Sequence, residues 1–418
     1  MEEITEILFD LFIIFALAKA AGELFARIHQ PSIVGEVLVG VVIGPHALGL
    51  VGTPDGDLVS LFNGDKEAAR EALNIVFDVI AELGVIILLF VVGLETRLGE
   101  LLEVQGRAIA VGVLGIVFPF AMGFALIYAT GRSDVESAFV ATAMVATSVG
   151  ITARVMSEMG VIRSPEARII LGAAVVDDIL GLLLLAVVSS WGQDDVDVAE
   201  LGLTAAGAVL FVVFAALVGT RAIRRYSIHL ERLHVENSPF FFAMILMLGL
   251  SAMAGIVGLA AIIGAFLAGM MLSEADESFE IDRQARPIYE FLVPFFFVII
   301  GTRVDPGAFT DPEILALALG VTGLAVLGKL AGGWIGARLP ARSAAIVGVG
   351  MVPRGEVGLV VASIGAGIGV VSNDMFSVVV FMSIATTIAA PPVLAFLYRG
   401  HVAGPEGGGD RGMELAEP

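Results

Sequence analysis

The chain has 418 residues, of which 57% are hydrophobic and only 16% are charged, and its formal net charge at pH 7 is −20. These values exclude an ordinary soluble domain and indicate a helical membrane protein with many spans. The negative charge argues against nucleic acid or anionic lipid as the main binding partner. The 50 Gly residues allow membrane helices to approach closely, and the lack of Cys excludes disulfides and thiolate metal sites.

The hydrophobic residues form thirteen segments that we expect to cross the bilayer as helices, since roughly 20 residues span the hydrocarbon. In chain order they cover residues 4–26, 32–50, 75–96, 108–130, 136–159, 166–191, 201–221, 238–257, 258–273, 288–304, 313–337, 343–367 and 372–397. The first segment has no basic region before it and contains Lys19, so it is predicted to be a retained helix and not a cleaved signal.

Basic residues are unevenly distributed between the connections on the two sides of the membrane. Connections after odd-numbered segments hold most of the Arg residues, whereas those after even-numbered segments hold only Lys66, Arg70, Arg132 and Arg303. By the positive-inside rule the odd-numbered side is cytoplasmic, which puts the N-terminus outside and the C-terminus in the cytoplasm. Acidic loops with little Lys resemble proteins of high-salt cytoplasms, a hint of a halophilic prokaryote.

Two acidic residues, Asp177 and Asp178, are adjacent within the apolar run 166–191. An aspartate near the centre of a membrane helix costs at least about 2.5 kcal/mol on insertion scales, so it points by default to an ion or proton pathway. Neighbouring side chains on a helix point about 100° apart, so one aspartate can face a charged partner while the other faces a water-filled cavity. The alternative is a structural cluster of ion pairs.

Three short motifs of the first half recur in the second half in the same order. Residues 34–40 match 263–269, residues 90–97 match 297–303, and residues 143–150 match 350–358. Each match is offset by seven segments, and because seven is odd the second copy is inverted in the membrane. Inverted repeats are an architecture of secondary transporters, with the substrate site between the halves near the midplane.

Polar residues, Gly and Pro interrupt the fifth and twelfth segments, at residues 146–152 and 353–356. Pro removes a backbone hydrogen bond and Gly permits irregular dihedral angles, so both helices are predicted to be broken there. A broken helix exposes carbonyls and helix ends that can ligate a cation, which makes Thr147 and Ser148 candidate site residues. Alternatively, these hydroxyls bond the preceding turn and the Gly residues pack against neighbouring helices.

Lys329 lies in the eleventh segment with apolar residues on both sides. A lysine inside a membrane helix needs a counter-charge, and the aspartate pair is the natural candidate. Snorkelling of Lys329 towards an interface is the alternative. Arg354 and Glu356 lie in the twelfth segment, where we weigh local neutralisation of one by the other equally with a role in transport.

In this order the motifs resemble those of the monovalent cation:proton antiporters, and among them the NapA-like sodium/proton exchangers. The resemblance covers residues 1 to about 397. It is carried by residues 30–36 with Gly44 and Pro45, residues 90–95 and 146–151, the Asp177–Asp178 pair, Gly328 with Lys329, and residues 352–358.

The resemblance implies an all-α polytopic membrane protein of the NhaA/NapA-like fold, with about 13 transmembrane helices, two inverted repeats of six joined by a linker helix, and two discontinuous crossing helices. It also implies the domains. Residues 1–104 and 236–310 would form a panel that makes a homodimer, residues 105–195 and 311–400 the transport core, residues 196–235 the linker helix, and residues 401–418 a disordered cytoplasmic tail.

The resemblance further implies the roles of the site residues. Asp178 would be the essential carboxylate for the cation and the proton, and Asp177 would be bridged to Lys329 in the proton-loaded state. Both aspartates would ligate the transported Na⁺, with Thr147 and its neighbours capping the site. An Asp–Asp pair is associated in this family with electrogenic exchange.

We therefore expect a lipid-embedded antiporter of the cell membrane that exchanges Na⁺ or Li⁺ for H⁺ by alternating access, with no cofactor and no enzymatic activity. A K⁺/H⁺ antiporter of the same family, a sodium-coupled organic-anion symporter and a passive channel stay open. Potassium-efflux relatives commonly carry a cytoplasmic nucleotide-binding domain, which is not found in this chain. An intramembrane aspartic protease is disfavoured, because carboxylates 100° apart on one helix do not converge on one water.

Overall fold

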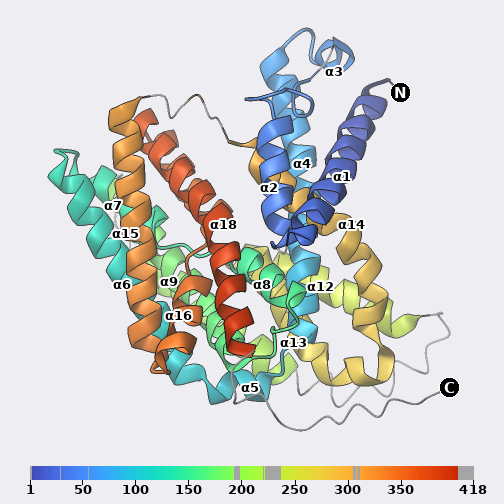
Figure 1. The fold of residues 1–418 in the computed structure, drawn as a ribbon, viewed down its shortest axis with the longest axis vertical. Coiled ribbons are helices and arrows are strands. Elements are labelled where there is room, and N and C mark those ends of the chain that lie inside the picture. The colour runs from blue at the N-terminus through green and yellow to red at the C-terminus, as the bar shows by residue number, and fades with distance from the viewer. Residues whose placement is uncertain are drawn as a thin grey trace.

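The computed structural model describes residues 2–28, 30–54, 56–192, 198–219, 237–304 and 311–402, with the single positions 221 and 307. Every regular element in this part of the chain is helical (Figure 1). Seven of the helices searched there are long and apolar enough to cross a membrane, and four further apolar helices are shorter. Of the predicted tail, 401–418, the first two residues belong to the last helix and residues 403–418 lie outside the described residues, as does much of the connection after residue 219.

The helices follow one another with short connections. They are α1 (Glu2–Arg27), α2 (Ser32–Ile43), α3 (Gly56–Leu61), α4 (Lys66–Leu94), α5 (Leu98–Glu103), α6 (Gln105–Ala129), α7 (Asp134–Ala143), α8 (Val149–Glu158), α9 (Pro165–Gly192), α10 (Val198–Val213), the π-helical turn η1 (Phe214–Gly219), α12 (Ser238–Ile256), α13 (Ala261–Phe279), α14 (Ile281–Thr302), α15 (Pro312–Ala337), α16 (Ala341–Gly350), α17 (Glu356–Gly367) and α18 (Asn373–Val402). The apolar segments correspond to these helices in order, with α7–α8 and α16–α17 as the two broken ones.

Several boundaries differ from those predicted. Helix α4 begins at Lys66 and not at residue 75, because the Asp65 side chain caps it by accepting from the backbone N–H of Glu67 (3.0 Å) and of Ala68 (3.1 Å). Helix α2 ends at Ile43 and not at residue 50. Hydropathy detects the apolar part of a helix, so it misses polar turns that extend a helix and includes apolar residues that follow one.

The two ends of the bundle are distinguished by where the helices begin and end. Helix α1 begins at the end drawn at the top of Figure 1, called here the upper end, and α18 ends at the opposite, lower end, where α5 lies. Helix α9 also begins at the lower end, because Arg168 near its start forms an ion pair of 2.8 Å with Glu100 of α5. Residues of α9 after Asp178 therefore lie towards the upper end.

The helices pack in two groups, which appear on the left and right of Figure 1. In one group α6 packs against α7, α9 and α15, and α18 packs against α15, α16 and α17. In the other, α4 packs against α13 and α14, and α2 packs against α1 and α14. Helix α8 of the first group contacts α2 and α4 of the second. The predicted division into core, panel and linker, and the roles of these parts as moving and fixed domains, stay predictions.

Two close helix crossings in the second group are formed by glycines of the repeated sequence motifs. Helices α2 and α14 cross at Gly40 and Gly301, and a Cβ atom added to Gly40 would lie 2.1 Å from a carbonyl oxygen of α14. Helices α13 and α4 cross at Gly269 and Gly93, and a Cβ atom added to Gly269 would lie 2.1 Å from a carbonyl oxygen of α4. The motifs align Gly40 with Gly269 and Gly301 with Gly93, so these crossings are equivalent contacts of the two repeats.

Candidate ion-binding site

Two broken helices cross at the centre of the first group. The break between α7 and α8 covers the residues from Met144 to Ser148, and the break between α16 and α17 covers those from Met351 to Gly355. The Ser148 N–H donates to the Pro353 carbonyl oxygen at 2.8 Å, which joins the two breaks directly. The interruptions predicted from Pro, Gly and polar residues are therefore present, and each repeat contributes one.

Arg354 holds the two breaks together from inside. It is fully buried, and its Nη1 donates to the Ala146 carbonyl oxygen (2.9 Å) and lies within 3.4 Å of the Thr147 hydroxyl oxygen. The same nitrogen reaches the Met351 carbonyl oxygen at 3.3 Å. Helices α7 and α16 both end near these contacts, and a guanidinium is favourable where carbonyls at helix C-termini gather.

Two threonines of α18 fix the backbone of Arg354. The Arg354 N–H donates to the Thr386 hydroxyl oxygen at 3.1 Å, and the Thr387 hydroxyl donates to the Arg354 carbonyl oxygen at 2.7 Å. Neither threonine is among the site residues predicted from the sequence. The sequence feature that could have indicated them is the pair of adjacent hydroxyl residues, 386–387, in the middle of the last apolar segment.

Asp177 and Lys329 form a buried ion pair between α9 and α15. The Lys329 Nζ lies 2.9 Å from Asp177 Oδ1 and 3.1 Å from Oδ2, and both side chains have an exposed fraction of 0%. Lys329 therefore does not snorkel to an interface. The contact implied for Asp177 is present in the structure, while its part in transport stays a prediction.

Small residues make room for the lysine between α6 and α15. A Cβ atom added to Gly115 of α6 would lie 3.3 Å from Lys329 Nζ. One added to Gly332, a turn further along α15, would lie 2.7 Å from the Gly115 nitrogen. The helices can therefore approach closely beside Lys329, which keeps the ammonium group within reach of Asp177.

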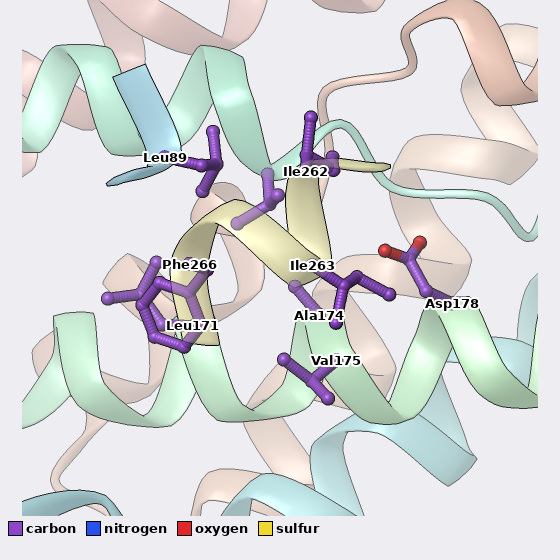
Figure 2. A pocket seen from close by; sticks show the side chains of 9 residues that line it. Leu89, Leu171, Ala174, Val175, Asp178, Ile262, Ile263 and Phe266 are labelled. Carbon is purple, nitrogen blue, oxygen red and sulfur yellow. The ribbon is translucent and has the colours of Figure 1, made fainter. Parts of the chain in front are cut away.

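Asp178 points away from that pair, into the space between the two helix groups. Figure 2 shows its carboxylate leaving α9 at one end of a small apolar cavity lined by Leu89, Ala174 and Phe266. Asp178 also lines a larger cavity of about 310 Å³ on its upper side. The first residue of α8, Val149, borders the small cavity, and Val357 at the start of α17 borders the large one. Helix N-termini thus lie close to the carboxylate and favour its negative charge.

The remaining predicted residues differ in how far the structure describes them. Thr147 is buried in the break and its hydroxyl donates to the Met351 carbonyl oxygen at 3.3 Å. Ser148 contributes its backbone N–H to the contact between the breaks. The side chain of Glu356 lies outside the described residues, so its pairing with Arg354 stays a prediction. No group of three or more His, Cys, Asp or Glu that could hold a resident metal occurs among the residues searched.

A second polar cluster, which the sequence analysis also missed, joins the two helix groups near the lower end. We call Ser32, Arg154, Glu158 and Tyr289 the lower cluster. The Ser32 N–H donates to Glu158 at 3.2 Å, Arg154 Nε donates to the same carboxylate at 2.7 Å, and Arg154 also bonds the Tyr289 hydroxyl. The Arg154 guanidinium lies 5.0 Å from the Tyr289 ring centroid. Ser32 belongs to the motif at residues 30–36, and this motif was the only feature of the sequence that pointed to the lower cluster.

The inverted repeats, the crossed broken helices and the buried charges define the class of the protein, which is that of secondary transporters built from inverted repeats. The chain belongs to the sodium/hydrogen exchanger family, since the model of that family's transmembrane region matches residues 12–400.

Individual relatives agree with this assignment. The chain is 35% identical to the high-affinity Na⁺/H⁺ antiporter NhaS3 of Synechocystis, over 94% of this chain and 90% of the relative. It is 34% identical to the Na⁺/H⁺-K⁺ antiporter GerN of Bacillus cereus, over 94% and 96% of the two chains. The sodium proton antiporter MjNhaP1 of Methanocaldococcus jannaschii has the same fold, with a TM-score of 0.64, 16% identity and coverage of 96% and 98%. The chain is therefore a multi-pass membrane protein of the cation:proton antiporters.

Proposed function

We propose that this protein exchanges Na⁺ or Li⁺ for H⁺ by alternating access, with Asp178 as the carboxylate that takes either the cation or a proton. The observation that carries the proposal is the contrast between the adjacent aspartates. Asp177 is neutralised by Lys329 in a fully buried pair, whereas Asp178 borders a cavity large enough for a hydrated cation. A carboxylate at membrane depth beside such a cavity is suited to exchange of a proton for a metal cation.

The charges of the site indicate how many protons move. In the proton-loaded state Asp178 is neutral and the Asp177–Lys329 pair sums to zero. When Na⁺ binds between the two carboxylates, Asp178 releases its proton and Lys329 releases a second one, so the site carries one net negative charge. Two protons then enter for each Na⁺ that leaves, and a membrane potential of 100 mV contributes about 2.3 kcal/mol to each cycle.

The helix group of residues 105–192 and 312–402 is the part that we expect to move. It contains both broken helices and the ion pair, and it meets the other group partly across an apolar cavity of about 220 Å³ lined by α5, α6, α9, α10 and α13. An apolar surface that is not tightly interdigitated can slide without breaking hydrogen bonds. Helices of the other group would form the fixed panel and the contact of a homodimer.

Potassium is the second candidate cation. The name of the GerN relative includes K⁺ beside Na⁺, and sequence similarity to it extends over nearly all of both chains. The family assignment favours exchange with protons over the organic-anion symport and the passive channel.

The test is cation-driven proton flux in proteoliposomes that contain a pH-sensitive dye. Na⁺, Li⁺ and K⁺ are compared with the membrane potential free and clamped, in the wild type, in Asp178→Ala and in the exposed control Asp134→Asn on α7. We expect Na⁺ or Li⁺ to drive flux in the wild type and the control and not in Asp178→Ala, and we expect the clamped potential to change the rate. Full activity of Asp178→Ala would contradict the assignment of this residue.

The orientation, with the upper end outside the cell, is part of the proposal. The chain has no Cys, so a single introduced thiol can be labelled without background. Thr53→Cys, exposed at the upper end, should react with a membrane-impermeant maleimide added to intact cells, whereas Glu103→Cys at the end of α5 should not.

A further inference from the structure

The cavity of about 310 Å³ above Asp178 is formed by both helix groups. Asp178, Gly181, Leu182 and Leu185 contribute from α9, Thr142 and Ala146 from the α7 side, Val357, Val360 and Val361 from α17, Glu82 from α4, and residues 258–261 from the connection between α12 and α13. Its walls are mostly apolar, and the two ionisable residues among those that line it are both carboxylic acids, Glu82 and Asp178. A cation in this cavity therefore lies in the field of both carboxylates.

Glu82 differs from Asp78, the acidic residue one turn earlier on α4. The Asp78 side chain forms an ion pair with Arg303, the residue that follows α14. Glu82 is half-buried, and no hydrogen bond or ion pair of its carboxylate is found within the described part of the chain. The ionisable groups that face it are Asp78 on its own helix and, across the cavity, Asp178 on α9. Its neighbours Ala81 and Val85 are buried in helix packing, so contacts that Glu82→Gln leaves intact hold this part of α4 in place.

An ionisable side chain inside a membrane helix is costly and points to an ion pathway unless it is paired. A cleft with apolar walls and a single sign of charge also concentrates the field, and it raises the local concentration and the arrival rate of counter-ions. Both statements apply to Glu82, which adds a second negative charge to a cavity that already leads to Asp178.

We propose that Glu82 is an access carboxylate for the monovalent cation, which captures it in the upper cavity before it passes to Asp178. This inference rests on the proposed function, since it assumes that a cation travels to Asp178. It goes further in two ways. It assigns cation recognition to a residue of α4, which belongs to the second helix group, and it restricts the effect of Glu82 to one face of the membrane. When the site opens to the lower end, Glu82 no longer lies on the path.

The test compares half-saturating cation concentrations at the two faces. Right-side-out and inside-out membrane vesicles are prepared from cells without their own Na⁺/H⁺ exchangers, and labelling of Thr53→Cys identifies the vesicles that present the upper end. The variants are Glu82→Gln, Glu82→Asp and the matched control Glu71→Gln, which removes an exposed charge from the same helix. The cation is whichever of Na⁺, Li⁺ and K⁺ drives proton flux in the wild type.

We expect Glu82→Gln to raise the half-saturating concentration at the upper face by about three- to tenfold relative to the lower face, the scale of one charge at roughly 10 Å in a partly hydrated cleft. Glu82→Asp should recover most of this difference, and Glu71→Gln should show none. An unchanged ratio, or an equal change at both faces, would overturn the role of Glu82. Absence of cation-driven flux in the wild type would instead overturn the proposed function, so the two failures are distinguishable.

Discussion

The charges of Lys329 and Asp177 can be neutralised only by each other, because neither side chain reaches solvent. Removing one partner of a buried ion pair leaves an uncompensated charge and costs about 3–5 kcal/mol, whereas replacing both partners by neutral groups of similar size is often tolerated. The pair therefore stabilises this conformation, and it is also a candidate store of one proton.

This dependence predicts a specific pattern of stabilities. Lys329→Gln should lower the melting temperature of the purified protein, corresponding to a loss of about 3 kcal/mol. The double variant Asp177→Asn with Lys329→Gln should regain most of that loss, because two amides can bond each other and no charge is left buried. Thermal unfolding in detergent measures both. Equal melting temperatures of the single and double variants would show that the two residues are not energetically coupled.

The Arg354 side chain supplies hydrogen bonds that the two broken helices cannot make within themselves. The break of a membrane helix leaves carbonyls without intrahelical partners, and no water in the hydrocarbon can satisfy them. The guanidinium donates to the carbonyl oxygens of Ala146 and Met351, one in each break, and also to the carbonyl oxygen of Ala325 in α15. A lysine at this position could not reach them together from one point charge.

At the scale of elements, the glycine crossings determine how closely the helices of the second group pack. A Cβ atom at Gly40, Gly301, Gly93 or Gly269 would lie 2.1 to 2.3 Å from a backbone oxygen of the facing helix, and a backbone atom cannot turn aside as a side chain can. The helices would have to separate, which strains the packing over several turns.

We therefore expect Gly40→Ala and Gly269→Ala to destabilise the protein by similar amounts, about 1–3 kcal/mol each, since they occupy equivalent positions of the two repeats. The control is Gly249→Ala in α12, where an added Cβ atom meets nothing within 4 Å. It should be neutral or slightly stabilising, because Ala favours helix. Melting temperatures compare the three variants. A fall in the control as large as in the crossing variants would contradict the argument.

At the scale of the whole molecule, the two helix groups are joined near the lower end by polar contacts and are separated by the large cavity above Asp178. The lower cluster bonds α8 of the first group to α2 and α14 of the second. Glu36, one turn along α2 from Ser32, is 2% exposed. Alternating access requires these contacts to break when the site opens to the lower end.

Cross-linking tests this requirement. Because the chain has no Cys, only the introduced thiols react with the reagent. A short bifunctional thiol reagent applied to Ser32→Cys with Glu158→Cys should join α2 to α8 and stop transport, and a cleavable reagent should allow recovery on reduction. The control pair, Arg132→Cys with Asp374→Cys, lies within the first group, where the two native side chains form an accessible ion pair of 3.6 Å. It should cross-link without loss of flux. Full transport with α2 joined to α8 would exclude relative movement there.

Much of the fold could be predicted from the sequence because its causes are local. The apolar segments follow from the length of helix that lipid requires, and the two breaks follow from Pro, Gly and hydroxyl residues in the middle of apolar runs. The inverted repeat could be read because seven segments separate the matching motifs. The position of Asp177 and Asp178 at membrane depth needed no structure either.

The helices, their interruptions and the depth of the charges can thus be predicted from the residues, since each depends on a single segment. The residue pattern left open which aspartate meets Lys329, and only the family resemblance pointed to Asp177; that Thr386 and Thr387 hold Arg354, and that one cavity is lined by both Glu82 and Asp178, needed the three-dimensional structure. These contacts join residues far apart in the chain, and the rotation of each helix about its axis selects which side chains meet. A rotation of about 100° would exchange the two aspartates without changing any local pattern.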